Sequence, residues 1–134
     1  MFFTGQFNHI FRNILINMNK FRQIREEEKT LVAFLLSECN FTIQDYPLAE
    51  KVNEYEGGIM GSINFAGSNP DLYDTDLIQA EYTDIDGVDV VITLTRDKNN
   101  RLLDLDFWKM NFSKLVRYPA PHQLTILRKI QPEV

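Results

Sequence analysis

The feature that most constrains the fold is a long stretch of alternating apolar and polar residues between Leu77 and Met110. A period of two is typical of strands that bury one face. Two interruptions rich in turn-forming residues divide the stretch, one at Asp84–Gly87 and one at Asp97–Asn100. The stretch therefore predicts three antiparallel strands joined as a meander.

The first interruption also determines how its two strands pair. A two-residue turn at Asp86-Gly87 would mix polar and apolar residues on one face. A three-residue loop, Ile85–Gly87, with the glycine left-handed in a bulge, instead places Asp84 opposite Val88. The pairs beyond this loop are then all apolar: Tyr82 with Val90, Ala80 with Ile92, and Ile78 with Leu94. We expect this register, because a slip of one residue would turn the hydrophobic set toward water.

One face of the predicted meander is apolar and supplies the core. Its residues are Ile78, Ala80, Tyr82, Val88, Val90, Ile92, Leu94, Leu103, Leu105 and Phe107. Burying such side chains contributes ~1.5–3 kcal/mol each. A helix near residues 25–39 is predicted to cover them, since its first turn carries three glutamates and its leucines and phenylalanine share a face. Cys39, at the apolar end of this helix, is expected to be buried.

A hairpin is predicted before the meander, with strands Lys51–Glu56 and Ile59–Phe65 around Gly57-Gly58. Residues 124–130 fit either a last edge strand or a terminal helical turn. The predicted fold class is α+β: one or two helices packed on one face of an antiparallel sheet of about five strands (hairpin plus three-stranded meander). These elements form a single domain over residues 23–134.

Residues 1–22 read as an N-terminal amphipathic extension, a helix with an apolar stripe at i, i+3, i+4 spacing. The stripe consists of Phe7, Ile10, Phe11, Ile14, Leu15, Met18 and Phe21. Three interpretations stay open: packing on the domain, an extension upstream of a natural start at Met18, or peripheral association with a membrane. We favour packing or extension over membrane association.

The net charge of −5 is unevenly distributed. Residues 26–106 hold 18 acidic and five basic residues, whereas both ends of the chain are basic. An acidic centre repels phosphate backbones, so we expect no nucleic-acid partner. It suits a basic protein partner, the basic ends of the chain itself, or simply a solvated surface.

The single cysteine excludes a disulfide framework within the chain, and no apolar run approaches the ~20 residues that a transmembrane helix needs. No secretory signal is evident, and we expect a cytoplasmic protein. The usual sequence patterns of hydrolases, metalloproteases and phosphate-binding loops are missing, and the only histidines are His9 and His122. The prediction is a protein that is not an enzyme and takes no cofactor.

Candidate site residues lie on the opposite, more polar face of the meander. Asp104 and Asp106 are two positions apart on one strand, which places their α-carbons roughly 7 Å apart on the same side. Such carboxylates can share a proton or hold a hard cation, or they can be ordinary residues of a half-exposed sheet. Trp108 lies beside them, and an exposed tryptophan is common at the centre of interfaces. The candidate surface comprises Glu81, Asp89, Thr93, Asp104, Asp106 and Trp108.

The stretch from Met18 to about Arg117 resembles a family of small uncharacterised bacterial proteins, a domain of unknown function. The resemblance is carried by Arg25–Leu31, by Gly57–Ser62, by Asp84–Val88 and by Leu105-Asp106-Phe107-Trp108-Lys109. It implies the fold and no activity. The size and acidity of the chain are also similar to those of bacterial immunity proteins, which is analogy alone.

The leading hypothesis is therefore a non-catalytic acidic protein-binding module, of the kind that an immunity-type inhibitor uses against a basic partner. One alternative is a carboxylate-based metal-binding protein or hydrolase that uses the Asp104/Asp106 face. A second alternative is membrane association through residues 1–22. The sequence leaves the oligomeric state open.

Overall fold

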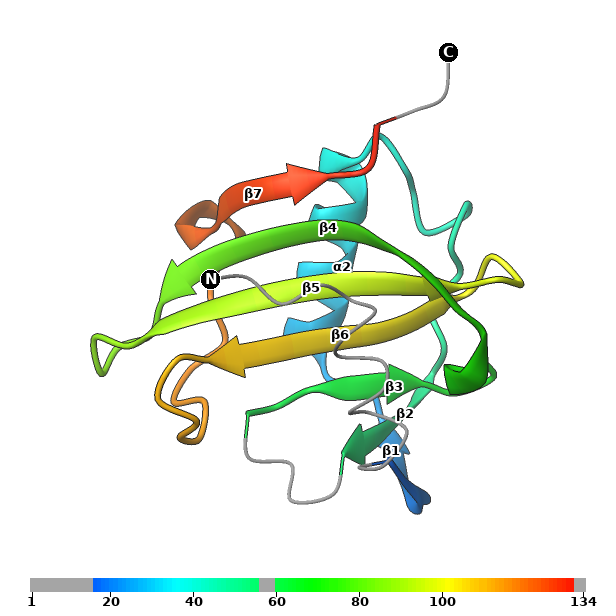
Figure 1. Ribbon diagram of the computed structural model, residues 1–134, viewed down its shortest axis with the longest axis horizontal. Helices are drawn as coiled ribbons and strands as arrows, with labels where there is room; N and C mark the ends of the chain where they lie inside the picture. Colours follow the sequence, from blue (N-terminus) through cyan, green and yellow to red (C-terminus); the bar gives the residue numbers. More distant parts are fainter. Residues whose placement is uncertain (1–15, 56–59, 132–134) are drawn as a thin grey trace.

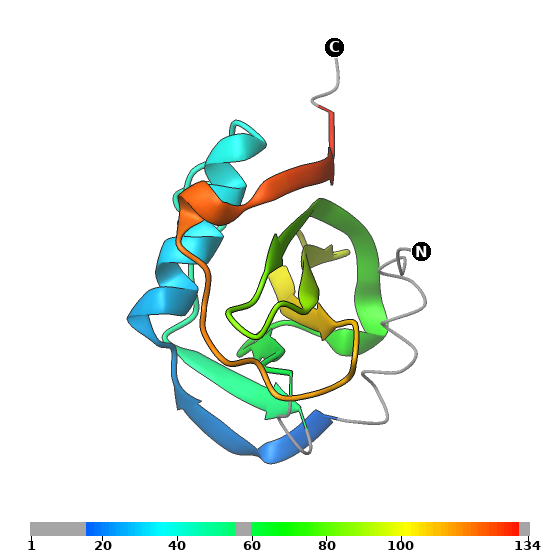
Figure 2. The same cartoon turned by 90° about the vertical axis from the view of Figure 1, so that its left-hand side faces the viewer.

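A computed structural model describes residues 16–55 and 60–131 of the chain. Seven strands form one antiparallel sheet, and helix α2 (Glu26–Glu38) lies against one face of it (Figures 1 and 2). The predicted α+β class, with a helix on one face of an antiparallel sheet, is confirmed. The sheet is larger than the predicted five strands, because both of its edges carry a strand outside the expected hairpin and meander.

The strands lie side by side in the order β1, β2, β3, β6, β5, β4, β7. Their bounds are Ile16–Gln23 (β1), Lys51–Tyr55 (β2), Ile63–Phe65 (β3), Tyr73–Thr83 (β4), Asp89–Asp97 (β5), Leu102–Lys109 (β6) and Thr125–Lys129 (β7). Short 3₁₀ turns, η1 (Pro70–Leu72) and η2 (Pro121–Gln123), precede β4 and β7. The predicted meander is thus the centre of the sheet.

The register predicted for β4 and β5 is confirmed. Tyr82 pairs with Val90, Ala80 with Ile92 and Ile78 with Leu94. The Asp84 N–H donates to the Val88 carbonyl at 2.9 Å, and Gly87 has a φ of +82°. A left-handed glycine therefore closes the three-residue loop, because side chains larger than hydrogen disfavour that conformation.

A β-bulge on β6 changes which residues at the start of that strand face the core. Leu94 pairs with Leu105, but Arg96 pairs with Leu102, so β6 holds one more residue than β5 over this interval. Leu102 joins the core cluster in place of Leu103, which the alternation predicts on the core face and which is fully buried but not part of that cluster. Leu105 and Phe107 lie beyond the bulge and face the core as expected.

The helix expected over residues 1–22 is wrong in the part that the structure describes. Residues 16–23 form strand β1, which pairs with β2, while residues 1–15 lie outside the described residues. A short apolar segment can satisfy helical and extended spacing alike, and here pairing with a neighbouring strand prevails. At the other edge, β7 resolves the alternative for residues 124–130 as a strand.

The pairing of the two hairpin strands is confirmed, since β2 pairs with β3, but β3 begins at Ile63 and not at Ile59 as predicted. The Gly57-Gly58 turn of the hairpin lies outside the described residues. Among the described helices, none is long and apolar enough to cross a membrane.

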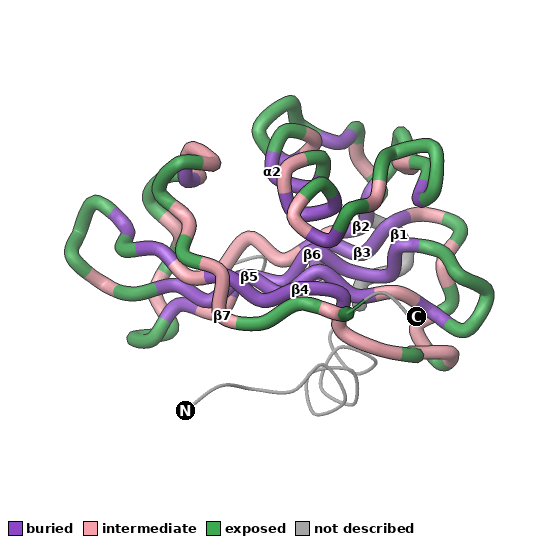
Figure 3. The backbone as a smooth tube through the Cα atoms, turned by 90° about the horizontal axis from the view of Figure 1, so that it is seen from above, coloured by how far each residue is buried: buried purple, intermediate pink, exposed green. Residues whose placement is uncertain are grey.

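The core lies between α2 and the central strands, where Figure 3 shows buried positions on both layers. The helix contributes Leu31, Val32, Leu35 and Leu36. Cys39 is buried after the helix end as predicted, and burial raises the pKa of its thiol.

The start of α2 is fixed by a fully buried carboxylate that the sequence did not single out. Glu28 accepts hydrogen bonds from the Arg25 N–H at 2.8 Å, from two guanidinium nitrogens of Arg22 at 2.9 and 2.8 Å, and from the Tyr118 hydroxyl at 3.2 Å. These contacts hold β1, α2 and the segment before η2 together, and they offset the missing Ser, Thr, Asp or Asn cap.

Candidate functional site

The six candidate residues lie on the face of the sheet that α2 does not cover. Strand pairing aligns Glu81, Val91 and Trp108 in one row and Gln79, Thr93 and Asp106 in the next. The alternate residues of these strands belong to the core cluster on the helix side. The candidate residues therefore lie on one face of the sheet and their neighbours along each strand on the other, as the alternation predicts.

Exposure divides this face into two regions. Thr93, Asp104 and Asp106 retain only 2%, 1% and 7% of their accessible surface, whereas Asp89 is exposed and Glu81 and Trp108 are half-buried. The buried region, here called the polar half, consists of Asn53, Tyr55, Asn64, Gln79, Thr93, Thr95, Asp104 and Asp106. The open region, called the aromatic end, consists of Glu81, Ile85, Asp89, Trp108, Met110 and Phe112.

In the polar half, hydrogen-bond donors hold the carboxylates. Asp104 accepts from the Tyr55 hydroxyl and from Asn64 Nδ2 at 3.2 Å, and its own N–H donates to Thr95 Oγ1 at 3.1 Å. The Asp106 carboxylate accepts from the Ser62 hydroxyl at 2.6 Å. Each aspartate is thus engaged by its own neighbours, as buried carboxylates must be.

Within the described residues, no three His, Cys, Asp or Glu side chains are placed to hold a metal ion. The candidate carboxylates lie on one face as the sequence predicts, but the structure brings no third such ligand to them among residues 16–55 and 60–131.

Asn53 is the exception in this well-bonded region. It lies on β2 directly opposite Asn64, so both side chains are on the same face. Its side chain is almost fully buried, and neither its amide nitrogen nor its amide oxygen makes a hydrogen bond within the described part of the chain. The polar half therefore contains one buried amide that adds nothing to the network around it.

The aromatic end gathers apolar side chains in contact with solvent. The rings of Trp108 and Phe112 meet edge to face, with centroids 5.3 Å apart. Phe112 keeps 61% of its surface exposed, and Met110, Ile85 and Val116 nearby are also exposed. Of the six large exposed hydrophobic residues in the described part of the chain, only Phe21 and Ile43 lie elsewhere.

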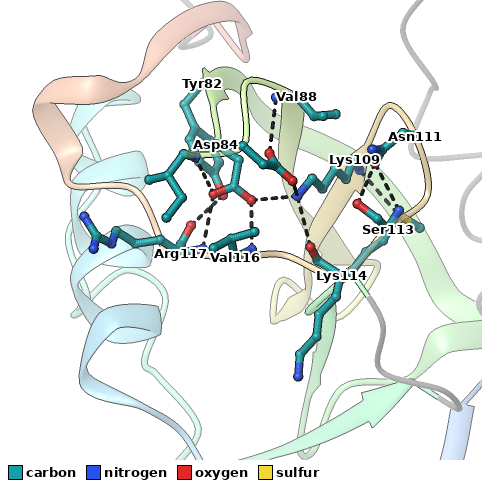
Figure 4. A network of polar contacts seen from close by, with 12 residues as sticks. Tyr82, Asp84, Val88, Lys109, Asn111, Ser113, Lys114, Val116 and Arg117 are labelled. Carbon is teal, nitrogen blue, oxygen red and sulfur yellow. Dashed lines mark hydrogen bonds and ion pairs between the residues drawn. The ribbon is translucent and has the colours of Figure 1, made fainter.

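A buried lysine holds the loops of this end together, as Figure 4 shows. Lys109 Nζ lies 3.0 Å from Asp84 Oδ2 and 2.5 Å from Asp86 Oδ2, and it donates to the Lys114 carbonyl at 3.0 Å. The Asp84 carboxylate also accepts the N–H groups of Val116 and Arg117 at 2.8 and 3.2 Å. This network, called the Lys109 clamp, ties the β4–β5 turn to the segment that follows β6.

The clamp changes the pKa of its ionisable groups. Burial alone would raise the pKa of Asp84, but the Val116 N–H and Lys109 lower it below its usual value. Burial would likewise lower the pKa of Lys109, yet its hydrogen bonds to Asp86 and Asp84 raise it. Tyr82, which donates to the Arg117 carbonyl at 3.0 Å, has a pKa raised by burial and by Asp84. Asp84 and Lys109 therefore stay ionised and paired at neutral pH, while Tyr82 keeps the hydroxyl proton that it donates to Arg117.

Sequence reasoning missed the clamp and Phe112. A signal for the clamp existed, because Asp84 and Lys109 both occupy inward-facing positions next to otherwise apolar residues. Two opposite charges at inward positions of one meander are expected to pair. No comparable signal marked Phe112, which follows the last strand of the meander.

Comparison with known families matches residues 21–119 to the model of a family described as "Domain of unknown function (DUF6984)". No curated protein and no solved structure matches the chain. The matched range begins within β1 and ends just before η2, so it includes α2, the meander, the clamp and the aromatic end.

Proposed function

Because the chain belongs to the DUF6984 family, whose description assigns no activity, we propose from its structure that it is a protein-binding module whose contact surface is the aromatic end. The observation that carries this proposal is the clustering of exposed aromatic and apolar side chains on loops that a buried ion pair fixes in place. Such rigid, open aromatic groups supply most of the binding energy at protein interfaces.

The chemistry of the partner follows from the acids beside the aromatic rings. Glu81 lies in the same row as Trp108, and Asp89 lies next to Met110, whose N–H donates to the Asp89 carbonyl at 3.0 Å. Within residues 16–55 and 60–131, neither carboxylate takes part in an ion pair. Two carboxylates outside any ion pair, next to the half-buried Trp108 and the exposed Phe112, suit a partner with basic side chains around an apolar centre.

A small acidic protein that covers a basic surface in this way is the immunity-type inhibitor that the sequence suggests. Support for this finer proposal comes from the charge of the chain and from the two acids at the aromatic end. The alternative that uses Asp104 and Asp106 for metal or hydrolytic chemistry is less well supported, because both carboxylates are buried and hydrogen bonds from Tyr55, Asn64 and Ser62 engage the Oδ1 atom of each.

A capture experiment with matched variants tests the proposal. Full-length protein is immobilised as wild type, as Trp108→Ala/Asp89→Asn, and as Ile43→Ala/Asp71→Asn, and lysate of the source cells is passed over each. Ile43 and Asp71 are exposed residues outside the aromatic end, so the control pair removes the same kinds of group elsewhere.

We expect a basic protein that wild type and the control pair retain at low salt and that the Trp108/Asp89 pair does not retain. Its retention should fall steeply with added salt. Equal retention by all three proteins, with their folds verified by circular dichroism, would exclude the aromatic end as the binding surface.

A further inference from the structure

Phe112 has an unusual backbone conformation for its residue type. Three described residues other than glycine have a positive φ: Asn40 at 62°, Asn100 at 61° and Phe112 at 62°. Asparagine visits this left-handed region readily, whereas a bulky aromatic residue rarely does. The chain therefore holds a strained conformation at a side chain that remains mostly in solvent.

The surroundings of Phe112 enforce this conformation. Its N–H donates to the Lys109 carbonyl at 2.9 Å, which closes a turn directly after β6. Asn111 Oδ1 accepts from both the N–H and the hydroxyl of Ser113, and Lys109 Nζ holds the Lys114 carbonyl on the far side of the turn. The Lys109 clamp thus fixes both ends of the short segment that presents the Phe112 ring.

In the isolated protein, burial of the Phe112 ring offsets little of this backbone strain, since most of the ring is in solvent. Backbone strain of this kind is concentrated at sites where function requires it. We propose that Phe112 is the anchor residue of the interface, the side chain that enters an apolar pocket of the partner. This inference rests on the proposed function and identifies the residue of the aromatic end that contributes most to binding.

The pocket is expected to carry a basic rim. Trp108 lies on the sheet side of the Phe112 ring, and Glu81 and Asp89 follow it on the neighbouring strands. Neither acid forms an ion pair within the described residues. The bases of the same segment, Lys114 and Arg117, are exposed on either side of Leu115 and Val116, in the stretch that leads to Tyr118 and the core. A ring presented in a fixed position loses little conformational entropy on binding, so the clamp raises the affinity that one aromatic side chain can supply.

The test separates binding from stability. Phe112→Gly and Phe112→Asn remove the ring and relieve the positive-φ strain, so both variants should melt at or above the temperature of wild type. Asn40→Gly, at an exposed position after α2 with the same φ of 62°, is the control for introducing glycine. A melting temperature of Phe112→Gly more than about 4 °C below that of wild type would make Phe112 a structural residue and overturn the proposal.

Binding is measured by site-specific photo-crosslinking in the source cells, with p-benzoylphenylalanine at position 112 and, as control, at position 43. Position 112 should crosslink to an apolar segment of one protein with lysine or arginine close by, and position 43 should not. Crosslinks from position 112 to an acidic segment or to lipid, or equal yields from both positions, would overturn the proposal.

Capture of the same partner should weaken at least about 30-fold in Phe112→Gly, as expected for an interface hot spot. Undiminished capture by Phe112→Gly, together with loss in the Trp108/Asp89 pair, would overturn the anchor and leave the proposed function intact. Failure of wild type to capture any partner would count against both.

Discussion

The polar half and the aromatic end lie on the same face of the sheet and share strands β4, β5 and β6, yet they differ in what their side chains contact. Asp104 and Asp106 are buried and receive hydrogen bonds, whereas Asp89, on the neighbouring strand, is exposed. A position on the outer face of the sheet therefore does not decide whether a residue serves stability or recognition. Exposure and bonding partners decide it.

The largest expected effect comes from breaking the clamp beneath the aromatic end. Lys109→Met leaves the buried Asp84 carboxylate without its cation and frees the Lys114 carbonyl. Because an uncompensated buried charge is strongly destabilising, we expect the melting temperature to fall by more than about 10 °C.

Lys114→Met is the matched control, since only the backbone of Lys114 takes part in the clamp and its side chain is exposed. It should melt within about 2 °C of wild type. Similar melting temperatures for Lys109→Met and Lys114→Met would show that the clamp does not hold this end.

The next effect contrasts the two regions directly. Asp104→Ala removes the acceptor for Tyr55 and Asn64 in the buried polar half and should cost about 3 kcal/mol in the free energy of unfolding. Asp89→Ala at the aromatic end should change it by less than about 0.5 kcal/mol. Urea denaturation measures both, and equal costs would remove the distinction between the regions.

Alkaline pH should act on the aromatic end. Burial raises the pKa of Tyr82, and hydrogen bonds to Asp86 and Asp84 overcome burial to raise the pKa of Lys109. Their stabilising contributions are therefore complete below the unfolded values of about 10 to 10.4 and are lost as the pH rises through the folded ones.

Trp108 is the only tryptophan of the chain and lies at this end, so its fluorescence reports the loosening. We expect the fluorescence to change above about pH 10 before the far-ultraviolet circular dichroism of the whole sheet does. Simultaneous changes in both signals would contradict a local role for these groups. At the acidic limit, the lowered pKa of Asp84 means that its contribution is lost only below about pH 3.9.

The smallest effect tests the unbonded amide of the polar half. Asn53→Val removes two buried polar atoms that make no hydrogen bond and should raise the free energy of unfolding by up to about 1 kcal/mol. Asn64→Val, at the opposite position, removes three hydrogen bonds and should lower it. A loss of stability in Asn53→Val comparable to that in Asn64→Val would show that Asn53 also has a bonding role.

Much of this arrangement could be read from the amino-acid sequence, because a period of two leaves little freedom once one turn is identified. The loop at Ile85–Gly87 placed Tyr82 opposite Val90, and the parity of Asp89 and Trp108 followed. The misplacement of Leu103 on the core face arose from a β-bulge on β6, which inserts a residue without a marker such as glycine.

Which residues of the outer face are exposed could not be predicted from the sequence in the same way. The alternation that put Thr93 and Asp106 on the outer face says nothing of what lies over that face, since burial depends on segments distant in the sequence. Phe112 was unpredictable for a different reason, because its conformation opposes the preference of its residue type. The fold therefore followed from local pattern, whereas the division of the candidate surface required tertiary structure.

Thiol labelling tests this division most directly. Single Thr93→Cys and Asp89→Cys variants are treated with an excess of a thiol reagent, and wild type, whose Cys39 is buried, gives the background rate. We predict that the thiol at position 89 reacts as fast as a small exposed thiol. The thiol at position 93 should react only as fast as the protein opens. Equal fast rates at both positions would contradict the division of this face into a buried polar half and an exposed aromatic end.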